Sequence, residues 1–279
     1  MPTAKELLDR FTIDYDVLLE RARRWRISNV PEQAVELLRG LQGRYPLALE
    51  IGQELVLALI DANKRDEAQV EMHKLQSQLR NPNEELLSRW GRLFKEDGDR
   101  LNPHLPDELK GRSTDDRRPN DAELADRFYA DSQQKYNQAY QVRLGHYPGI
   151  NKATLLLVRA SLASAMQDSE RARAFVNQAQ RLAGELLERR RRNDWPDDQP
   201  DDHKVWHPAT EAEALLLLRE WKRAADLYRS IPMTAGHRSS IVKQIERILA
   251  AWDQLGAKKR DECQSIETIF PKQEGDSAH

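Results

Sequence analysis

Apolar residues recur at every third or fourth position through the long stretches of this chain, and this spacing constrains the fold more than any other feature. From Ile241 to Leu255 one such series ends at Gly256, a residue suited to stopping a helix. No stretch alternates as a strand would, so the pattern predicts an all-α fold. From Ser169 to Arg190 a second series holds one face over about five turns: Ala172, Phe175, Val176, Ala179, Leu182, Ala183, Leu186 and Leu187.

The helical segments are short and recur at a fixed offset along the chain. Aligning residues 31–46 with residues 65–80 places Ala34 on Ala68 and Leu41 on Leu75. This offset, a period of about 34 residues, is typical of tetratricopeptide-like helical hairpins. Residues 219–232 have the character of a second hairpin helix. The sequence therefore predicts a tetratricopeptide-like helical-hairpin solenoid, with an irregular helical bundle as the alternative.

Start signals place several helices. Residues 3–6 form a capping box, and Asn81 is expected to cap a helix with Pro82 in its first turn. The stretch 147–149 is expected to form a turn before a helix capped by Asn151. His207 and Pro208 mark a further helix entrance.

Composition breaks divide the chain. Residues 1–101 are predicted as N-terminal helical repeats, and 102–120, with its prolines and charges, as a loop or linker. Residues 121–256 are predicted as C-terminal helical repeats and 257–279 as a polar, mobile tail. A second acidic, proline-broken loop is expected at 193–203.

The charge balance argues against nucleic-acid binding. Lys plus Arg number 44 and Asp plus Glu 46, giving a net charge of -2, whereas a nucleic-acid binder usually carries a basic excess. Arg189–Arg192 is the one basic run, and acidic residues follow it at once. The single Cys263 excludes an intrachain disulfide. Because no window approaches 18 apolar residues and the start lacks a signal-peptide core, we expect a cytoplasmic protein without membrane contact.

No catalytic signature is present. The sequence lacks a nucleophile elbow, a P-loop and a dinucleotide fingerprint, so we expect no enzyme, no catalytic residue and no cofactor. His203 and His207 are four residues apart, but Pro208 and the lack of an intervening Glu argue against a metal site. His146 and His237 are expected in loops. The spaced Tyr129, Tyr136 and Tyr140 favour core or groove lining.

Four stretches, in order, resemble a known family. They are "GRLFKED" at 91–97, "YPGINKATLLL" at 147–157, "WHPATEAEALLLL" at 206–218 and "SSIVKQIERILAAW" at 239–252. They are similar to the TRAF-binding, central regulatory region of the apoptosis signal-regulating kinases, a tetratricopeptide-type domain also found without a kinase in bacterial chains. The resemblance covers about residues 47–255, and no kinase motif accompanies it.

The resemblance implies a scaffold that recognises proteins. Our first hypothesis is a non-catalytic regulatory adaptor that binds a protein or peptide, of unspecified identity, on a helical-repeat surface in signalling. This hypothesis is compatible with a homo-oligomer. The alternative is a sensor that binds a small molecule or nucleotide and moves by a hinge between two helical halves. The motif residues could bind a partner, although a structural role is favoured for them: Arg92, Lys95, Asn151, Lys152, Trp206, Thr210 and Glu213.

Overall fold

The protein is all-α, as its sequence predicts. A computed structural model describes residues 15–28, 30–79, 81, 83–106, 109, 120–196, 202–257, 264–266 and 268–269. Within those residues every regular element is a helix and no strand occurs. The chain divides into two compact units, Met1–Leu93 and Phe94–His279, and the division falls inside one helix.

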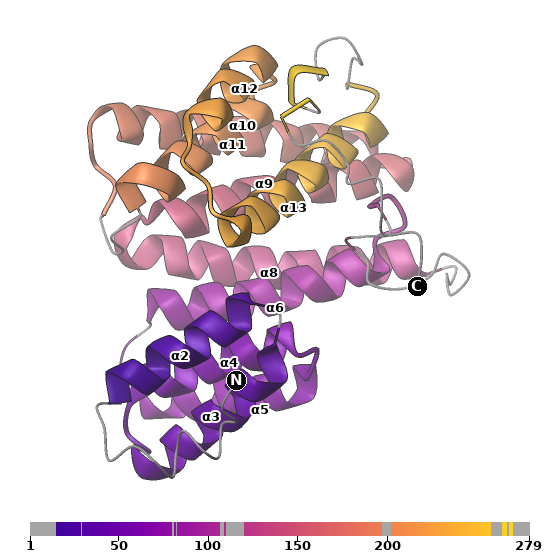
Figure 1. Ribbon diagram of the computed structural model, residues 1–279. Helices are drawn as coiled ribbons and strands as arrows, with labels where there is room; N and C mark the ends of the chain where they lie inside the picture. The colour runs from indigo at the N-terminus through magenta and orange to yellow at the C-terminus, as the bar shows by residue number, and fades with distance from the viewer. Residues whose placement is uncertain are drawn as a thin grey trace, which may run out of the picture. The chain divides into compact units, whose positions relative to one another are not determined.

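The first unit is built from successive helical hairpins. The indigo-to-purple helices of Figure 1 are α2 (Tyr15–Ile27), α3 (Pro31–Arg44), α4 (Leu49–Asp61), α5 (Arg65–Gln78) and the start of α6 (Glu84–Leu101). From α2 to α5 each helix packs on the next in the chain, and α2 also contacts α4, so the first helices of successive hairpins are neighbours. Helices α4 and α5 each begin one predicted period after α2 and α3, which confirms the repeat and the tetratricopeptide-like solenoid.

The aligned apolar positions of the repeat are the core of this unit. Ala34 and Leu41 of α3 are fully buried, and Ala68 and Leu75 of α5 are buried in the same way. Gly52 of α4 lies so close to Leu75 that a Cβ atom there would be 2.5 Å from the Leu75 Cδ2 atom. The sequence repeat is therefore a repeat of packing positions.

Helices of the second unit pack around one central helix, α9 (His146–Ala165). It packs against α8 (Asp121–Arg143), α10 (Ser169–Arg191), α11 (His207–Leu217) and α13 (Ala235–Gln254). Fifteen of its 20 residues are buried, which explains a long apolar run without reactive groups. The remaining elements are η2 (Asp202–Trp206), a π-helix before α11, and α12 (Trp221–Ser230) (Figure 1).

Several predicted helices are confirmed. Helix α10 follows the predicted 169–190 series, and Gly256 after α13 has the positive φ of 65° expected at a helix stop. Helix α11 begins at His207 with a proline in its first turn. Tyr129 and Tyr136 are buried in the core.

The predicted start of α9 is wrong. The helix begins at His146, so Pro148 and Gly149 lie in its first turn, and Asn151 is an interior residue rather than its cap. Proline is tolerated there because the first N–H groups of a helix have no intrahelical acceptor. A Cβ atom at position 149 would lie 2.9 Å from Leu186 and 3.0 Å from Tyr140, so glycine serves close packing of α9.

Two further local predictions need correction. Helix α6 begins at Glu84, and Asn83 rather than Asn81 caps it by accepting a hydrogen bond from the Leu86 N–H at 2.9 Å. His146 and His237, expected in loops, are helical. The ring of His237 pairs with the Thr234 N–H in a capping box at the start of α13.

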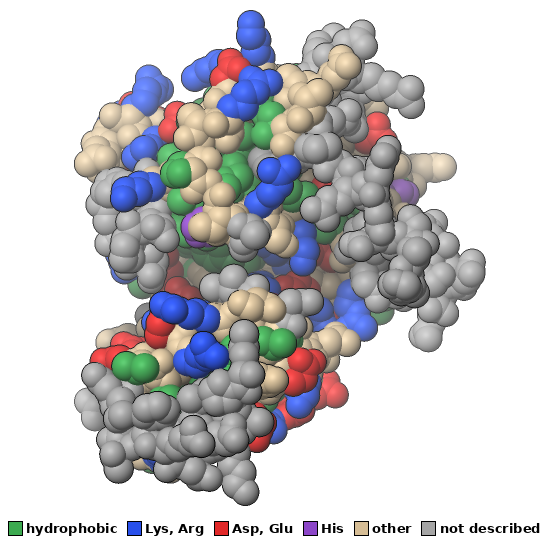
Figure 2. All heavy atoms as spheres, viewed as in Figure 1, with side chains coloured by type: hydrophobic (Ala, Val, Ile, Leu, Met, Phe, Trp, Pro, Cys, Tyr) green, Lys and Arg blue, Asp and Glu red, His purple; other side chains and the backbone are tan. Residues whose placement is uncertain are grey.

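The predicted linker and the other boundaries remain predictions. Residues 103–106 form turns, whereas residues 110–119 lie outside the described part of the chain, as do the capping box at 3–6 and most of the predicted tail. Among the described residues no helix combines the length and apolar character needed to span a bilayer. Basic and acidic side chains are interspersed over the visible face in Figure 2.

Candidate functional site

The seven candidate residues lie in several environments. Arg92 belongs to the first unit, although it shares α6 with Lys95 of the second unit. Asn151 and Lys152 lie on α9. The other three lie at or after the π-helix: Trp206, Thr210 and Glu213.

Lys95 and Asn151 form a buried pair in the second unit. The Lys95 ammonium donates to Asn151 Oδ1 at 2.7 Å, and Asn151 Nδ2 donates to the Tyr147 carbonyl at 3.0 Å. The ammonium also lies 5.8 Å from the centre of the Tyr136 ring. Both side chains are buried, so Asn151 fixes a buried cation between α6 and α9.

Glu213 is a buried carboxyl group on α11. Burial raises its pKa to about 8, although the charges of Lys95 and Arg247 and a hydrogen bond from Gln244 oppose that rise. A carboxyl group with this pKa is largely protonated at neutral pH. Glu213 therefore contributes a hydrogen-bonding group more than a fixed charge.

A buried ion pair connects α6 to α13. Arg247 donates to Asp99 Oδ2 through Nε at 2.9 Å and through Nη2 at 2.5 Å. Burial lowers the pKa of Arg247, but the charge and hydrogen bonds of Asp99 outweigh this and raise it overall. The Tyr129 hydroxyl donates to Asp99 Oδ1 at 2.9 Å, and burial and the Asp99 charge raise its pKa.

Gln244 extends this arrangement to α9. Its Nε2 atom donates to Thr154 Oγ1 at 3.1 Å, and its Oε1 atom accepts from Arg247 at 3.5 Å. Helices α6, α8, α9, α11 and α13 thus share one buried polar network, defined here as Lys95, Asp99, Tyr129, Asn151, Thr154, Glu213, Gln244 and Arg247.

Asp99, Gln244 and Arg247 were missed at the sequence level. A signal did exist, because Gln244 and Arg247 lie between Ile241, Ile245 and Ile248 on a face predicted to be buried. A buried polar side chain needs a partner. One helix alone does not reveal which residue supplies it.

Thr210 belongs to a separate aromatic cluster. Its hydroxyl is 3.1 Å from His146 Nδ1, and the His146 ring stacks on Trp195 with centroids 5.3 Å apart. His207 contacts both rings edge-on. In the described residues no group of three or more His, Cys, Asp or Glu side chains could hold a metal ion.

Lys152 and Trp206 make contacts of their own. The Lys152 ammonium donates to Asn137 Oδ1 at 2.7 Å and lies over Tyr140, and partial burial lowers its pKa. The Trp206 ring contacts His237 edge-on at 5.2 Å. Neither belongs to the buried polar network.

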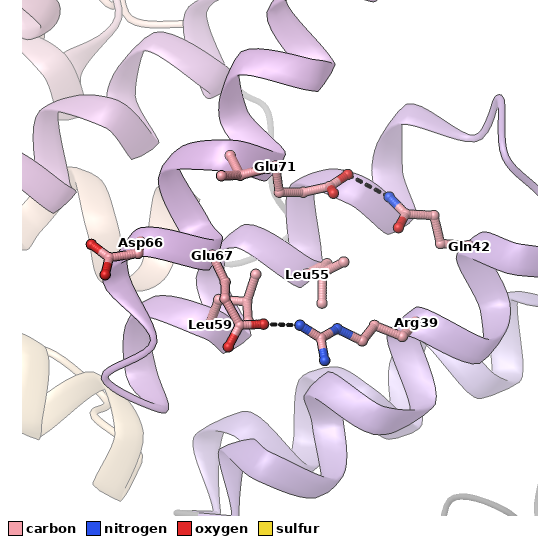
Figure 3. Close-up of a pocket in the computed structure, with 8 residues that line it drawn as sticks. Arg39, Gln42, Leu55, Leu59, Asp66, Glu67 and Glu71 are labelled. Atoms are coloured by element: carbon pink, nitrogen blue, oxygen red, sulfur yellow. Dashed lines mark hydrogen bonds and ion pairs between the residues drawn. The ribbon is translucent and has the colours of Figure 1, made fainter.

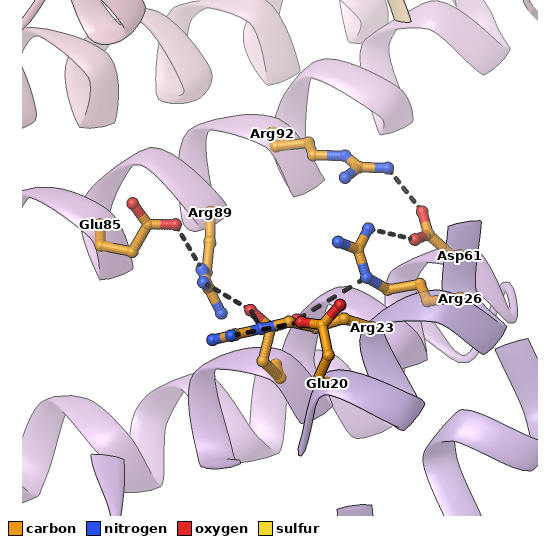
Figure 4. Close-up of polar contacts among 8 residues, drawn as sticks. Glu20, Arg23, Arg26, Asp61, Glu85, Arg89 and Arg92 are labelled. Carbon is orange, nitrogen blue, oxygen red and sulfur yellow. Dashed lines mark hydrogen bonds and ion pairs between the residues drawn. The ribbon is translucent and has the colours of Figure 1, made fainter. Parts of the chain in front are cut away.

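Arg92 belongs to a row of charges along α2, α4 and α6 of the first unit, shown in Figure 4. It donates to Asp61 Oδ1 at 2.6 Å, while Arg26 donates to Asp61 Oδ2 at 3.0 Å. Further along the row, Glu54 pairs with Arg23 at 3.3 Å and Arg89 at 3.6 Å. We call these residues the arginine ladder: Arg23, Arg26, Glu54, Asp61, Arg89 and Arg92.

The arginine ladder is partly open to solvent. The side chains of Arg23 and Arg92 are 41% and 28% exposed, whereas Glu54 is buried. Four guanidinium groups share two inner carboxylates. The flanking acids Glu20 and Glu85 pair with ladder arginines but are themselves more than half exposed.

Comparison with known families agrees with the hairpin geometry. Residues 31–156 match the family described as TPR-S, Tetratricopeptide Repeats-Sensor. The match supports a tetratricopeptide-type domain in this part of the chain. The match begins with α3 and ends within α9, so it includes Arg92, Lys95, Asn151 and Lys152. The finer resemblance to the kinase regulatory region remains a prediction.

A comparison with curated proteins finds no match. Tetratricopeptide-type repeat domains generally bind other proteins or act as sensors, and this class of domain is typically non-catalytic.

Proposed function

We propose that this protein is a non-catalytic adaptor that binds an acidic segment of a partner protein on the arginine ladder. The proposal includes a regulatory role in cytoplasmic signalling, in line with the family that the four motifs resemble. The observation that supports it is a set of four arginines, two on α2 and two on α6, that converge on the two carboxylates of α4.

The ladder has more donors than acceptors. Among the described residues, Arg89 Nη1 is buried without a hydrogen-bond acceptor, and Arg26 Nε has only Glu54 Oε2 nearby, at 3.8 Å and beyond hydrogen-bond distance. Each guanidinium offers five N–H donors and forms its strongest contacts with carboxylates. A partner carboxylate next to Arg23 and Arg92 would add acceptors where the protein supplies few.

The exposed ion pair of Arg23 with Glu20, at the edge of the ladder, does not prevent such binding. Pairs of this kind contribute little net free energy, because solvent screens them. An incoming carboxylate can therefore replace part of an existing pair at small cost. Charge attraction would also speed the encounter and make binding sensitive to salt.

Fluorescence anisotropy with a labelled octaglutamate peptide tests the proposal. We expect binding to weaken about tenfold between about 50 and about 200 mM salt, and about tenfold in Arg92→Gln and Arg23→Gln. Octaglutamine serves as the neutral probe. Arg229→Gln is the matched control variant, since Arg229 is an exposed arginine of α12 that pairs with Asp226. Equal binding to both probes would overturn the proposal.

The buried polar network favours a second candidate function. Lys95, Asn151, Thr154 and Glu213 are all buried, so a protein partner would reach them only after the helices separate. A small polar ligand needs less opening. The word Sensor in the description of the matching family fits this alternative.

A thermal-shift screen with nucleotides and other metabolites tests the sensor alternative. Stabilisation by one compound, lost in Lys95→Met and retained in the exposed-site variant Lys222→Met, would support it. Stabilisation that survives Lys95→Met would exclude the buried polar network as the site.

A further inference from the structure

A cavity of about 300 Å³ lies on the second helices of the hairpins in the first unit, where α3 and α5 face each other over α4 (Figure 3). Its floor is apolar, since Leu55 and Leu59 of α4 are both buried. Val70 of α5 lines the rim with 68% of its surface exposed. The cavity therefore combines a buried apolar floor with an apolar rim residue that water still covers.

The rim of the cavity is acidic. Asp66, Glu67 and Glu71 of α5 line it, whereas Arg39 of α3 is the only basic residue among its lining side chains. Two contacts join the helices across the cavity in Figure 3: Arg39 with Glu67, and Gln42 with Glu71. The carboxylates outnumber the guanidinium, so the cavity has a surplus of negative charge.

Asp66 and Glu67 also lie in the first turn of α5, where negative charge suits the helix dipole. That preference explains acidic residues at the start of a helix. It does not explain Glu71, which is further along the helix, is largely buried and accepts from Lys74 at 3.4 Å. Nor does it explain the apolar floor beneath them.

We propose that this cavity receives a basic side chain, lysine or arginine, from a protein partner. The aliphatic stem of that side chain would lie on Leu55 and Leu59, and its charged head would reach Asp66 and Glu67. Long basic side chains bind in this way, with the stem on apolar surface and the head towards water. A neighbouring apolar residue of the partner would cover Val70. A small basic molecule, which has no such neighbouring residue, would leave Val70 exposed.

The existing contacts permit this occupant. Arg39 and Glu67 are both about half exposed, and exposed ion pairs contribute little to stability. An incoming guanidinium can share Glu67 with Arg39 or take its place. Asp66 is exposed and lines the same cavity, so its carboxylate is free of burial when the ligand approaches.

The cavity and the arginine ladder are separate sites of opposite charge preference within one unit. Helix α4 contributes Glu54 and Asp61 to the ladder and Leu55 and Leu59 to the cavity floor. The inference does not depend on the proposed function. Substitutions in the ladder, such as Arg92→Gln, should leave binding at the cavity unchanged.

Methyl NMR on the full chain, labelled at leucine and valine methyl groups, tests the inference. The probes are acetyl-Leu-Arg-Leu-amide, the matched peptide acetyl-Leu-Glu-Leu-amide and free butylguanidinium. We expect the arginine peptide to shift the methyl signals of Leu55, Leu59 and Val70 in a saturable way. The glutamate peptide should leave them in place.

Two substitutions test whether the carboxylates of the cavity rim bind the basic side chain. Asp66→Asn removes one rim carboxylate without disturbing the Arg39–Glu67 pair, and with Glu67→Gln added we expect the affinity for the arginine peptide to fall about fivefold or more. Glu36→Gln is the matched control, since Glu36 is an exposed acid of α3 that does not line the cavity. Equal shifts with both peptides, no shifts, or unchanged affinity in the double variant would overturn the inference. Equal affinity for butylguanidinium would contradict the choice of a protein side chain as occupant.

Discussion

The two units use the same residue types in opposite ways. In the first unit, arginines and carboxylates form a ladder along α2, α4 and α6 that solvent reaches at Arg23 and Arg92. In the second unit, Arg247 and Asp99 lie buried among helices, Arg247 donates to Asp99, and Asp99 also accepts from the Tyr129 hydroxyl. Exposure therefore decides whether a charged pair is available to a partner or serves to hold helices together.

Breaking the buried ion pair should have the largest effect. Arg247→Met leaves the Asp99 carboxylate buried without its guanidinium, which typically destabilises a protein by about 3–5 kcal/mol. Chemical denaturation followed by circular dichroism measures this loss. The control Arg229→Met removes an exposed arginine from α12 and should change stability by less than about 0.5 kcal/mol. A loss below about 1 kcal/mol for Arg247→Met would contradict the assigned role.

The second-largest effect should be a pH dependence of stability caused by the raised pKa of Glu213. Its pKa is raised from 4.5 to about 8 in the folded state, so the folded protein holds a proton that the unfolded chain has released. The free energy of unfolding should therefore fall as pH rises from about 4.5 to about 8, by a few kcal/mol at most. Denaturation across this range should show that Glu213→Gln has lost this contribution. The same pH dependence in wild type and variant would refute the raised pKa.

Disturbing the close helix packing in the second unit should have a smaller effect on stability. A Cβ atom at Gly98 would lie 2.6 Å from the Tyr129 ring, so Gly98→Ala should destabilise the protein by about 1–3 kcal/mol. Gly184 is the matched control on α10, because a Cβ atom there has no neighbour within 4 Å. Gly184→Ala should stabilise its helix by up to about 1 kcal/mol. Thermal unfolding should separate the two, and shifts of the same sign would contradict the packing.

Breaking one ion pair of the partly exposed ladder should affect stability least. Arg92→Gln should cost less than about 1 kcal/mol, because Asp61 keeps its contact with Arg26 and solvent screens the pair. The same denaturation experiment as for Arg247→Met measures it. A cost of about 3 kcal/mol or more would mean that the ladder is as structural as the buried pair.

The sequence predicted the helical class and the repeat because both depend on the spacing of apolar residues along single helices. Ala34 and Leu41 are buried, as are their partners one period later, Ala68 and Leu75. The start of α9 was mispredicted because Gly149 is set by the close approach of side chains from α8 and α10. That contact comes from other helices and leaves no local signal.

Part of the buried polar network could also be read from the motifs. Lys95, Asn151 and Glu213 come from three separate stretches, and the structure brings them into one network. Asp99 and Arg247, which are 148 residues apart, could not be paired from one sequence. Their hydrogen bonds depend on how α6 and α13 pack.

Hydrogen exchange on the full chain, with and without the octaglutamate peptide, distinguishes the arginine ladder from the buried polar network as the binding site. Binding at the arginine ladder predicts slower exchange in α2, α4 and the part of α6 that carries Arg92, with little change in α9, α11 and α13. Slower exchange confined to α9, α11 and α13 would contradict it and would place the ligand at the buried polar network.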